Sequence, residues 1–335
     1  MASDLNEAQL LMTAVAALGI GKHDPQNPDI KGAQGVIDNS NCFGSALSSV
    51  QEHTAGIGAI DACYVAETEA SIILAFRGTL GWGTNVLQNL TTFLDWLNDF
   101  NAEPRTASDI PLGKVHSGFY QSVSNLAPFF IPDILNRWLK SNKKKKVVIT
   151  GYSKGAGMAP LAAVLLRNKN IPVDEVHLYE PPRCGDFNFM LAYNVAFPKT
   201  TRYEYQDDLV PHTPPTAIEM ALLDSSSAIA GILHLLYPDH DSWNYAPVGK
   251  LQFVDWTTPK PQIVSDSDDL EKQRMLHLTD DFAQSSMAPI QDHGLNGHLF
   301  DALMQAFSCG CTYPTWVDDP TSYDRLAAQG QQRSR

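Results

Sequence analysis

Basic residues are scarce in this sequence, and their scarcity argues against two kinds of anionic partner. Among 335 residues, 24 are Lys or Arg and 37 are Asp or Glu, which gives a formal net charge of −13. Nucleic acids and anionic membranes are bound by basic surfaces. The one basic cluster, Lys143–Lys146, is expected to be a solvated entry into a strand. We therefore expect no nucleic-acid partner and no tight docking on anionic membranes.

Cysteines are also few, and their spacing is irregular. The five cysteines form an odd set, which predicts mostly free thiols. Cys309 and Cys311 lie too close together for an ordinary zinc pair. The acidic stretch Asp266–Asp269 lacks the glycine turn and the distal glutamate of a calcium loop, so we expect a surface loop there. The sequence therefore predicts no metal and no organic cofactor.

Long apolar runs are lacking as well. No run of about 18 apolar residues is present to form a transmembrane segment. Near the N-terminus, Asp4 and Glu7 stand where a signal peptide needs positive charge, so an amphipathic helix is expected instead. These features predict a location that is cytoplasmic, or secreted without a recognisable signal peptide.

What the sequence does contain is an alternation of strand and helix patterns. Short apolar runs predict five strands, over Ser71–Phe76, Lys146–Thr150, Glu175–Tyr179, Thr201–Tyr205 and Lys250–Trp256. Helical patterns lie between them, over Asn85–Leu97, Gly118–Leu139 and Ala156–Leu166. This order predicts an α/β fold with a mostly parallel central sheet and helices on both faces. No composition break divides the chain, so we expect a single domain over residues 1–335, with a polar tail after about Cys311 that is loosely held at its end.

Ser153 is the first candidate functional residue. It stands in Gly151-Tyr152-Ser153-Lys154-Gly155, between a predicted strand and a predicted helix. A serine on such a turn has a strained backbone and needs small neighbours, which Gly151 and Gly155 supply. The pattern therefore predicts a nucleophile, and the alternative is a structural serine in a glycine-rich turn.

Acyl transfer from a serine also needs hydrogen-bond donors for an oxyanion. The backbone amide of Lys154 is one candidate, because it follows the serine and its role would need only the main chain. Thr79 follows the strand Ser71–Phe76 and is the second candidate, through its amide and its hydroxyl. The alternative for Thr79 is a helix N-cap.

Six segments in order resemble the class 3 lipases, the fungal-type lipases of the α/β-hydrolase superfamily. They are ILAFRGT (73–79), VHSGFYQS (115–122), VVITGYSKGAG (147–157), YEPPRCGDFNF (179–189), YQDDLVPHTPP (205–215) and DHGLNGHLFDAL (292–303). The resemblance covers roughly residues 40–305. It implies an α/β-hydrolase fold with a core over about residues 40–310. It also implies an esterase whose Ser, Asp and His occur in that order along the chain.

The resemblance suggests the acid and the base. Asp208 matches the family's acid, and Asp207 is then its solvated neighbour. His293 matches the family's catalytic histidine, while His298 occupies the place usually held by tyrosine and remains the alternative base. The histidines at 116, 212 and 240 are expected to be structural or exposed.

Three residues depart from the family's pattern. Tyr152 and Lys154 stand where the family usually has His and Leu around the serine, and they are expected to alter access to it or chain-length preference. Glu180 stands where the family usually has glycine, and is expected to leave the triad untouched.

Two apolar segments are candidates for contact with substrate. Leu80–Leu94 follows Thr79, where the family places its lid, and the alternative is a helix that faces the core. Ala217–Tyr237 lies between acid and base, and forms either an acyl-binding wall or a buried helical pair.

The sequence thus predicts a carboxylic ester hydrolase, with triacylglycerol lipase as the leading activity and a lipid or ester as its partner. Phospholipase A1 and short-chain esterase are the alternatives within the class. An acyltransferase and a non-catalytic hydrolase-fold binding protein are the alternatives outside it. The oligomeric state has no signal in the sequence.

Overall fold

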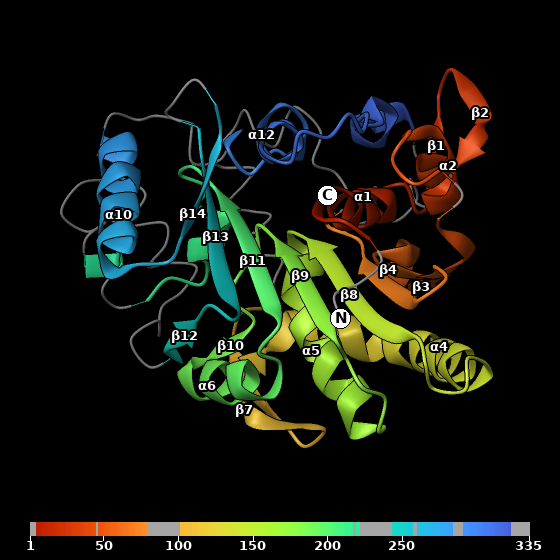
Figure 1. Ribbon diagram of the computed structural model, residues 1–335. Helices are drawn as coiled ribbons and strands as arrows, with labels where there is room; N and C mark the ends of the chain where they lie inside the picture. The colour runs from red at the N-terminus through yellow and green to blue at the C-terminus, as the bar shows by residue number, and fades with distance from the viewer. Residues whose placement is uncertain are drawn as a thin grey trace.

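An eight-stranded sheet forms the centre of the protein (Figure 1). The computed structural model describes residues 5–44, 46–79, 101–216, 219–221, 243–256, 260–283 and 291–322. The strands, in their order across the sheet, are β14 (Gln262–Ser265), β13 (Lys250–Asp255), β11 (Thr200–Tyr205), β9 (Glu175–Tyr179), β8 (Lys146–Tyr152), β5 (Ser71–Phe76), β4 (Asp61–Glu67) and β3 (Ser48–Ala55). Neighbouring strands from β13 to β5 pair in parallel, whereas β14 pairs antiparallel with β13, β4 with β5 and β3 with β4. The predicted mostly parallel sheet is confirmed.

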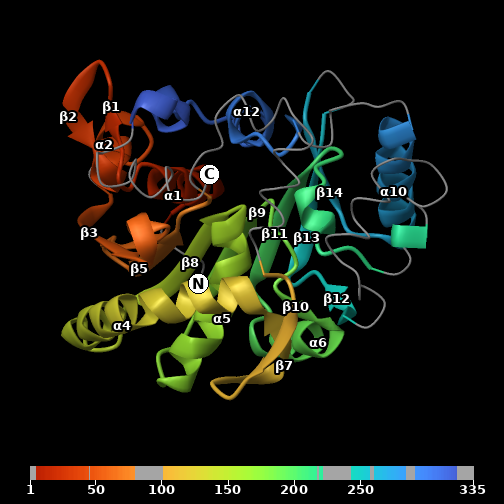
Figure 2. The same ribbon diagram turned by 180° about the vertical axis from the view of Figure 1, so that it is seen from behind.

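Helices cover both faces of this sheet (Figures 1 and 2). One face carries α1 (Glu7–Leu18), α2 (Gly32–Asn39) and α12 (Phe300–Ala306). The other face carries α4 (Ser117–Lys140), α5 (Lys154–Asn168) and α6 (Phe187–Ala196). A further helix, α10 (Asp268–Ala283), lies beside the β13–β14 edge. Among the described helices, none has the length and apolar character needed to cross a bilayer.

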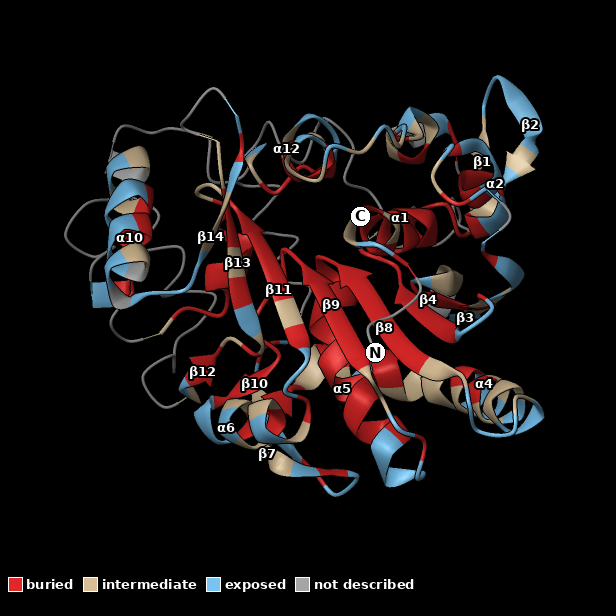
Figure 3. Ribbon diagram, viewed as in Figure 1, coloured by how far each residue is buried: buried red, intermediate tan, exposed pale blue. Residues whose placement is uncertain are grey.

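Alternation along the strands divides the core into two layers. In β8, Val148 packs toward α1 while Val147 and Ile149 pack toward α4 and α5. Side chains of a strand point to opposite faces in turn, so a strand covered on both faces is apolar throughout. The central strands are accordingly buried along almost their whole length (Figure 3).

The register of the parallel strands brings four loop residues to one edge of the sheet. The paired residues are Phe76 with Gly151, Tyr152 with Tyr179, and Tyr179 with Tyr203. Parallel strands in this register end at the same edge, where ligands bind in open α/β sheets. The residues that follow these strand ends are Thr79, Ser153, Glu180 and Asp208.

Two smaller sheets and several short turns complete the described fold. The four-stranded sheet contains β12 (Tyr245–Ala246), β10 (Gly185–Asp186), β7 (Ile110–His116) and β6 (Pro104–Ala107), in that order. A two-stranded sheet pairs β1 (His23–Asp24) with β2 (Asn27–Lys31). The short helical turns are η1 (Ile57–Ala59), η2 (Val210–His212), η3 (Leu295–Leu299), η4 (Thr315–Asp318) and η5 (Pro320–Ser322).

The N-terminal helix differs from the amphipathic helix that we expected. In α1 every residue from Leu10 to Leu18 is buried, and Gln9 is only partly exposed. A helix that is apolar all round is one that is buried all round. Here α1 lies between the sheet and the helices α2 and α12, so its far side is covered as well.

Other predicted elements are reproduced or fall outside the described residues. The strands β5 and β9 have the predicted bounds, and β8 extends two residues further, to Tyr152. The surface loop expected at Asp266–Asp269 is wrong in part, because α10 begins at Asp268 and the Leu270 amide donates to Ser267 Oγ. The helix expected over Asn85–Leu97 lies outside the described residues.

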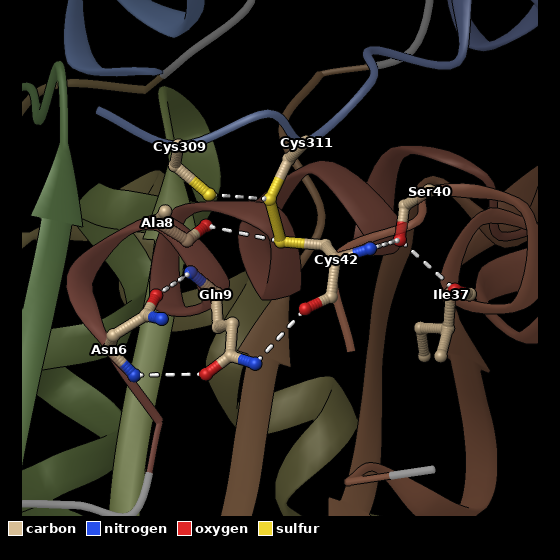
Figure 4. The surroundings of a disulfide bond; sticks show 8 residues. All are labelled: Asn6, Ala8, Gln9, Ile37, Ser40, Cys42, Cys309 and Cys311. Atoms are coloured by element: carbon tan, nitrogen blue, oxygen red, sulfur yellow. Dashed lines mark hydrogen bonds between the residues drawn. A yellow bond between two sulfur atoms is a disulfide. The ribbon is translucent and has the colours of Figure 1, made fainter. Parts of the chain in front are cut away.

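One disulfide is present, whereas the other cysteines are free, so the prediction of mostly free thiols holds for three of the five. Cys42 is bonded to Cys311, 269 residues away (Figure 4). The other three cysteines are free, and Cys309 Sγ lies 3.2 Å from Cys311 Sγ. The loop after α2 and the loop after α12 meet over α1, where Gln9 Nε2 donates to the Cys42 carbonyl. Tyr313 and Val317, just beyond, are buried, so the start of the tail is part of the core.

Candidate active site

Ser153 occupies the sharp turn between β8 and α5. Its backbone angles are φ 54° and ψ −125°, a region that residues other than glycine rarely adopt. Its amide donates to the Tyr179 carbonyl at 2.9 Å, which holds the strained turn against β9. The turn needs both neighbouring glycines. A Cβ at Gly155 would lie 2.3 Å from the Phe76 carbonyl oxygen, and one at Gly151 would lie 2.4 Å from the Gly155 backbone.

Three side chains from distant segments form a continuous hydrogen-bonded chain. His293 Nε2 lies 2.8 Å from Ser153 Oγ, and His293 Nδ1 lies 2.8 Å from Asp208 Oδ2. The other oxygen, Asp208 Oδ1, accepts from the Val210 amide at 2.9 Å, so the carboxylate has a fixed orientation. An ionised carboxylate only accepts, so it fixes the proton of His293 on Nδ1 and leaves Nε2 as the acceptor for the serine hydroxyl.

This hydrogen-bonded chain is shielded from water. Ser153, Asp208 and His293 each have 0% relative exposure. Burial raises the pKa of Asp208 above its ordinary value, and the adjacent His293 opposes that rise. Any molecule that reacts with Ser153 must therefore reach a fully covered hydroxyl group.

The competing histidines lie elsewhere. His298 Nδ1 lies 3.6 Å from Asp292 Oδ1, and the His298 side chain is one-third exposed. Among the described residues, His298 has no hydrogen bond with Ser153 or Asp208. His116 caps α4 by accepting from the Phe119 amide, and burial lowers its pKa to about 3. His212 is 2.9 Å from Glu219 in a buried ion-pair network, and His240 lies outside the described residues.

The two candidate oxyanion donors flank the serine. Lys154 is the first residue of α5. The amides of a helix N-terminus have no partner within the helix, so they are available to bind an anion. Its side chain turns away from the site, and Nζ lies 2.7 Å from Asp61 Oδ1. On the other side, Thr79 Oγ1 is buried and has no hydrogen-bond partner among the described residues. An unpartnered buried hydroxyl is costly, and such a group is often found where a ligand binds.

Tyr152 supports the histidine from the strand, which the sequence did not reveal. Its ring stacks on the His293 imidazole, with centroids 5.3 Å apart and planes 18° from parallel. Its hydroxyl donates to the His293 carbonyl. The residue before the serine thus fixes both the ring and the backbone of the histidine. The only sequence signal was its departure from the family's histidine at this place.

Glu180 also lies at this site, although we expected it to leave the triad untouched. Its Oε2 is 3.5 Å from His293 Nδ1, and its side chain has 0% relative exposure. The expectation was wrong because Glu180 follows β9, and the register of β9 between β8 and β11 puts it between Ser153 and Asp208.

A pocket of about 200 Å³ opens beside these residues. Thr79 and Tyr152 form the wall nearest the serine. The remaining wall is built from α1, the β1 approach, the turn at η3 and the segment around η4: Leu18, Lys22, Gly294, Leu295, Asn296, Tyr313, Val317 and Asp318. The disulfide-linked end of the chain thus forms part of the pocket.

Residues 73–218 match the sequence model of the lipases of class 3. This segment is similar to the class 3 lipases. It contains Thr79, Ser153 and Asp208, while His293 lies beyond it. Two predicted segments, the candidate lid Leu80–Leu94 and the candidate acyl-binding wall Ala217–Tyr237, lie outside the described residues except for 219–221.

Two relatives and one solved structure are similar to this chain. The chain is 30% identical over 171 residues to secreted mono- and diacylglycerol lipase 1 of Fusarium solani, a match that covers 50% of this chain and 46% of the relative. It is 26% identical over 236 residues to the chloroplastic phospholipase A(1) DAD1 of Arabidopsis thaliana. That match covers 64% of this chain and 50% of the relative. The chain therefore spans about half the length of these relatives. The crystal structure of a lipase from Rhizopus microsporus var. chinensis superposes with a TM-score of 0.55 at 17% identity, over 85% of this chain and 86% of that one. The fold is that of the α/β-hydrolases.

Proposed function

We propose that this protein hydrolyses carboxylic esters of lipids, as a triacylglycerol lipase, with Ser153 as nucleophile, His293 as base and Asp208 as orienting acid. The observation that carries the proposal is the unbroken hydrogen-bond chain from Ser153 Oγ through both nitrogens of His293 to Asp208, at 2.8 Å per step. A serine without a base is a weak nucleophile near neutral pH, and this arrangement supplies one.

The first half of the reaction makes an acyl-enzyme. Ser153 Oγ gives its proton to His293 Nε2 while it attacks the ester carbonyl carbon. The imidazolium that forms is stabilised by Asp208, which keeps accepting from Nδ1. When the tetrahedral intermediate collapses, Nε2 protonates the leaving alcohol and the acyl group stays on Ser153. A water molecule then repeats the same proton transfers and releases the acid.

The oxyanion of each intermediate is held by two donors in this proposal. The Lys154 amide lies next to the nucleophile at the N-terminus of α5. Thr79 supplies its amide and its hydroxyl, and the hydroxyl has no partner among the described residues that would compete. Donors that are already in place when charge develops need no reorganisation, which is the main source of their effect.

A second candidate substrate class is the phospholipids, with cleavage of the A1 type. The match to the Arabidopsis phospholipase A(1) covers more of this chain than the match to the Fusarium lipase. Short-chain esters are the third class, and transfer of the acyl group to another alcohol would use the same residues.

The surroundings of the site favour action at a lipid–water interface in an oxidising compartment. The complete burial of Ser153 supports an opening step that a lipid surface would promote. The Cys42–Cys311 disulfide supports the secreted location among the two that the sequence left open, since disulfides persist in oxidising compartments. The Fusarium relative carries the word secreted in its name.

Hydrolysis of p-nitrophenyl esters of graded chain length, together with triacylglycerol and phosphatidylcholine emulsions, tests the proposal. The wild type should hydrolyse these esters, and Ser153→Ala should reduce kcat by about a thousandfold or more. An inactive wild type would contradict the proposed ester hydrolase. Activity that survives in Ser153→Ala would place the nucleophile elsewhere.

A further inference from the structure

Glu180 combines two features that are unfavourable for folding. Its backbone has a φ of 50°, the left-handed region in which glycine is at ease and other residues are strained. Its carboxyl group is completely buried, and neither oxygen has a hydrogen-bond partner among the described residues. The nearby Tyr152 hydroxyl is directed to the His293 carbonyl instead. Features that cost stability and persist are a sign of function.

The place of Glu180 indicates what that function is. Its amide donates to the Tyr203 carbonyl at 2.8 Å, which fixes the residue between the ends of β9 and β11. From there, Oε2 lies 3.5 Å from His293 Nδ1, the same nitrogen that Asp208 Oδ2 contacts at 2.8 Å. Two carboxyl groups therefore face one N–H group, one within hydrogen-bond distance and one a few tenths of an ångström beyond it.

The charges around Glu180 decide its resting state. Burial raises the pKa of Glu180 well above its ordinary value, and the acidic groups around it raise the pKa further. The titratable groups that face it come from every neighbouring element: Tyr152 on β8, Glu204 on β11, Asp208 after β11, and Asp292 and His293 before η3. Burial and the acidic neighbours thus favour the neutral form of Glu180, whereas the contact with His293 favours the charged form of Asp208. Removing the charge of Asp208 also removes the main acidic neighbour that keeps Glu180 neutral.

We propose that Glu180 is a reserve acid of the proposed esterase, a positioning residue that holds His293 Nδ1 when the Asp208 carboxyl group is removed. The role rests on the proposed function of Ser153 and His293. When Asp208 is lost, Glu180 releases its proton to solvent, closes the short gap to Nδ1 and accepts the hydrogen bond that Asp208 accepted. His293 then keeps the tautomer that leaves Nε2 free to act as a base.

A double-mutant cycle with Asp208→Ala, Glu180→Gln and the double variant tests the proposal. The readout is kcat/KM for a soluble p-nitrophenyl ester between pH 5 and about 10, corrected for the fraction of serine that a phosphonate titrates. Asp208→Ala should keep at least about tenfold more activity than the double variant. Glu180→Gln alone should lose less than about threefold at pH 7. The profile of Asp208→Ala should rise with pH through an ionisation that the double variant lacks.

Two further variants separate this role from structural effects. Glu180→Gly removes the carboxyl group while it suits the positive φ, so it replaces Glu180→Gln if the amide disturbs folding. Asp292→Asn removes a charge that raises the pKa of Glu180 but that the structure does not place against Nδ1, so adding it to Asp208→Ala should move the ionisation in the pH profile to lower pH without abolishing it. Equal activity and equal pH profiles in Asp208→Ala and its Glu180 double variants would overturn the reserve role. A wild type without esterase activity would overturn the proposed function and this role with it.

Discussion

Lys154 and Asp61 form a buried ion pair directly behind the candidate nucleophile. Their Nζ and Oδ1 atoms are 2.7 Å apart, and the two side chains are 6% and 4% exposed. The second oxygen of Asp61 accepts from Asn125 Nδ2 at 3.1 Å. The ammonium group of Lys154 is therefore held by Asp61 at the start of β4. It does not occupy the space in front of the Ser153 hydroxyl.

Replacing Lys154 by methionine should destabilise the protein and spare the chemistry. The change leaves Asp61 charged, buried and without its cation, which costs about 3–5 kcal/mol of unfolding free energy. Adding Asp61→Asn should recover most of that loss, since no charge then remains unpaired. Urea unfolding measures both effects. Because the proposed role of Lys154 uses its amide, kcat of the folded Lys154→Met enzyme should stay within about tenfold of wild type. A thousandfold fall in kcat would assign the chemistry to the side chain.

Replacing Gly155 by alanine should distort the turn that carries Ser153. A Cβ there would meet the Phe76 carbonyl oxygen at 2.3 Å, so β5 and α5 must move apart. Overpacking of this kind costs about 1–3 kcal/mol, and we expect kcat/KM to fall by about tenfold or more. Gly310→Ala is the matched control, because nothing lies within 4 Å of its Cβ position. Wild-type activity in Gly155→Ala would show that the turn tolerates a side chain.

Glu204 should supply much of the acid sensitivity of the fold. Burial would raise the pKa of Glu204, but Arg274 and Arg202 overcome it and lower the pKa from 4.5 to about 2. Its stabilisation is therefore fully present above pH 4.5, and is lost as the pH falls from 4.5 toward 2. Glu204→Gln should cost on the order of 3 kcal/mol at pH 7 and flatten the acid limb of stability against pH. Urea unfolding at a series of pH values measures this, and an unchanged acid limb would contradict it.

Loss of the Cys42–Cys311 disulfide should lower the free energy of unfolding by about 2–5 kcal/mol. The reason is that the unfolded chain is then no longer restricted by a link between residues 269 positions apart. Thermal unfolding of Cys42→Ser measures the loss. Cys309→Ser is the matched control, since it removes the free thiol next to the disulfide and leaves the bond intact. If Cys42→Ser unfolds like the wild type while Cys309→Ser does not, the functional pairing involves Cys309 instead.

Local patterns predicted the frame of this protein well. The apolar runs of β5 and β9 end at turn residues, so their bounds could be read directly from the sequence. The glycines around Ser153 marked the strand-to-helix turn, because only glycine fits beside it. The resemblance to a family placed Asp208 and His293, and the structure brings both to Ser153. Their catalytic roles and the single-domain organisation stay predictions.

Features that depend on distant segments could not be predicted from the sequence. The burial of α1 on all sides results from α2 and α12, which cover its outer face. Cys42 and Cys311 meet only because both follow helices that pack on α1. Glu180 looked like a local departure from a motif, and only the register of β9 against β8 and β11 brings it to His293.

The central claim is that Ser153 is a nucleophile activated by His293, and covalent labelling tests it most directly. A fluorophosphonate reacts with activated serines by the same attack that opens an ester. Peptide mass spectrometry of the labelled wild type should find the adduct on Ser153. The rate of labelling should fall by about a hundredfold or more in His293→Ala, whereas His298→Ala should label at the wild-type rate. An adduct on another residue, or labelling of Ser153 that is unaffected by loss of His293, would contradict the account.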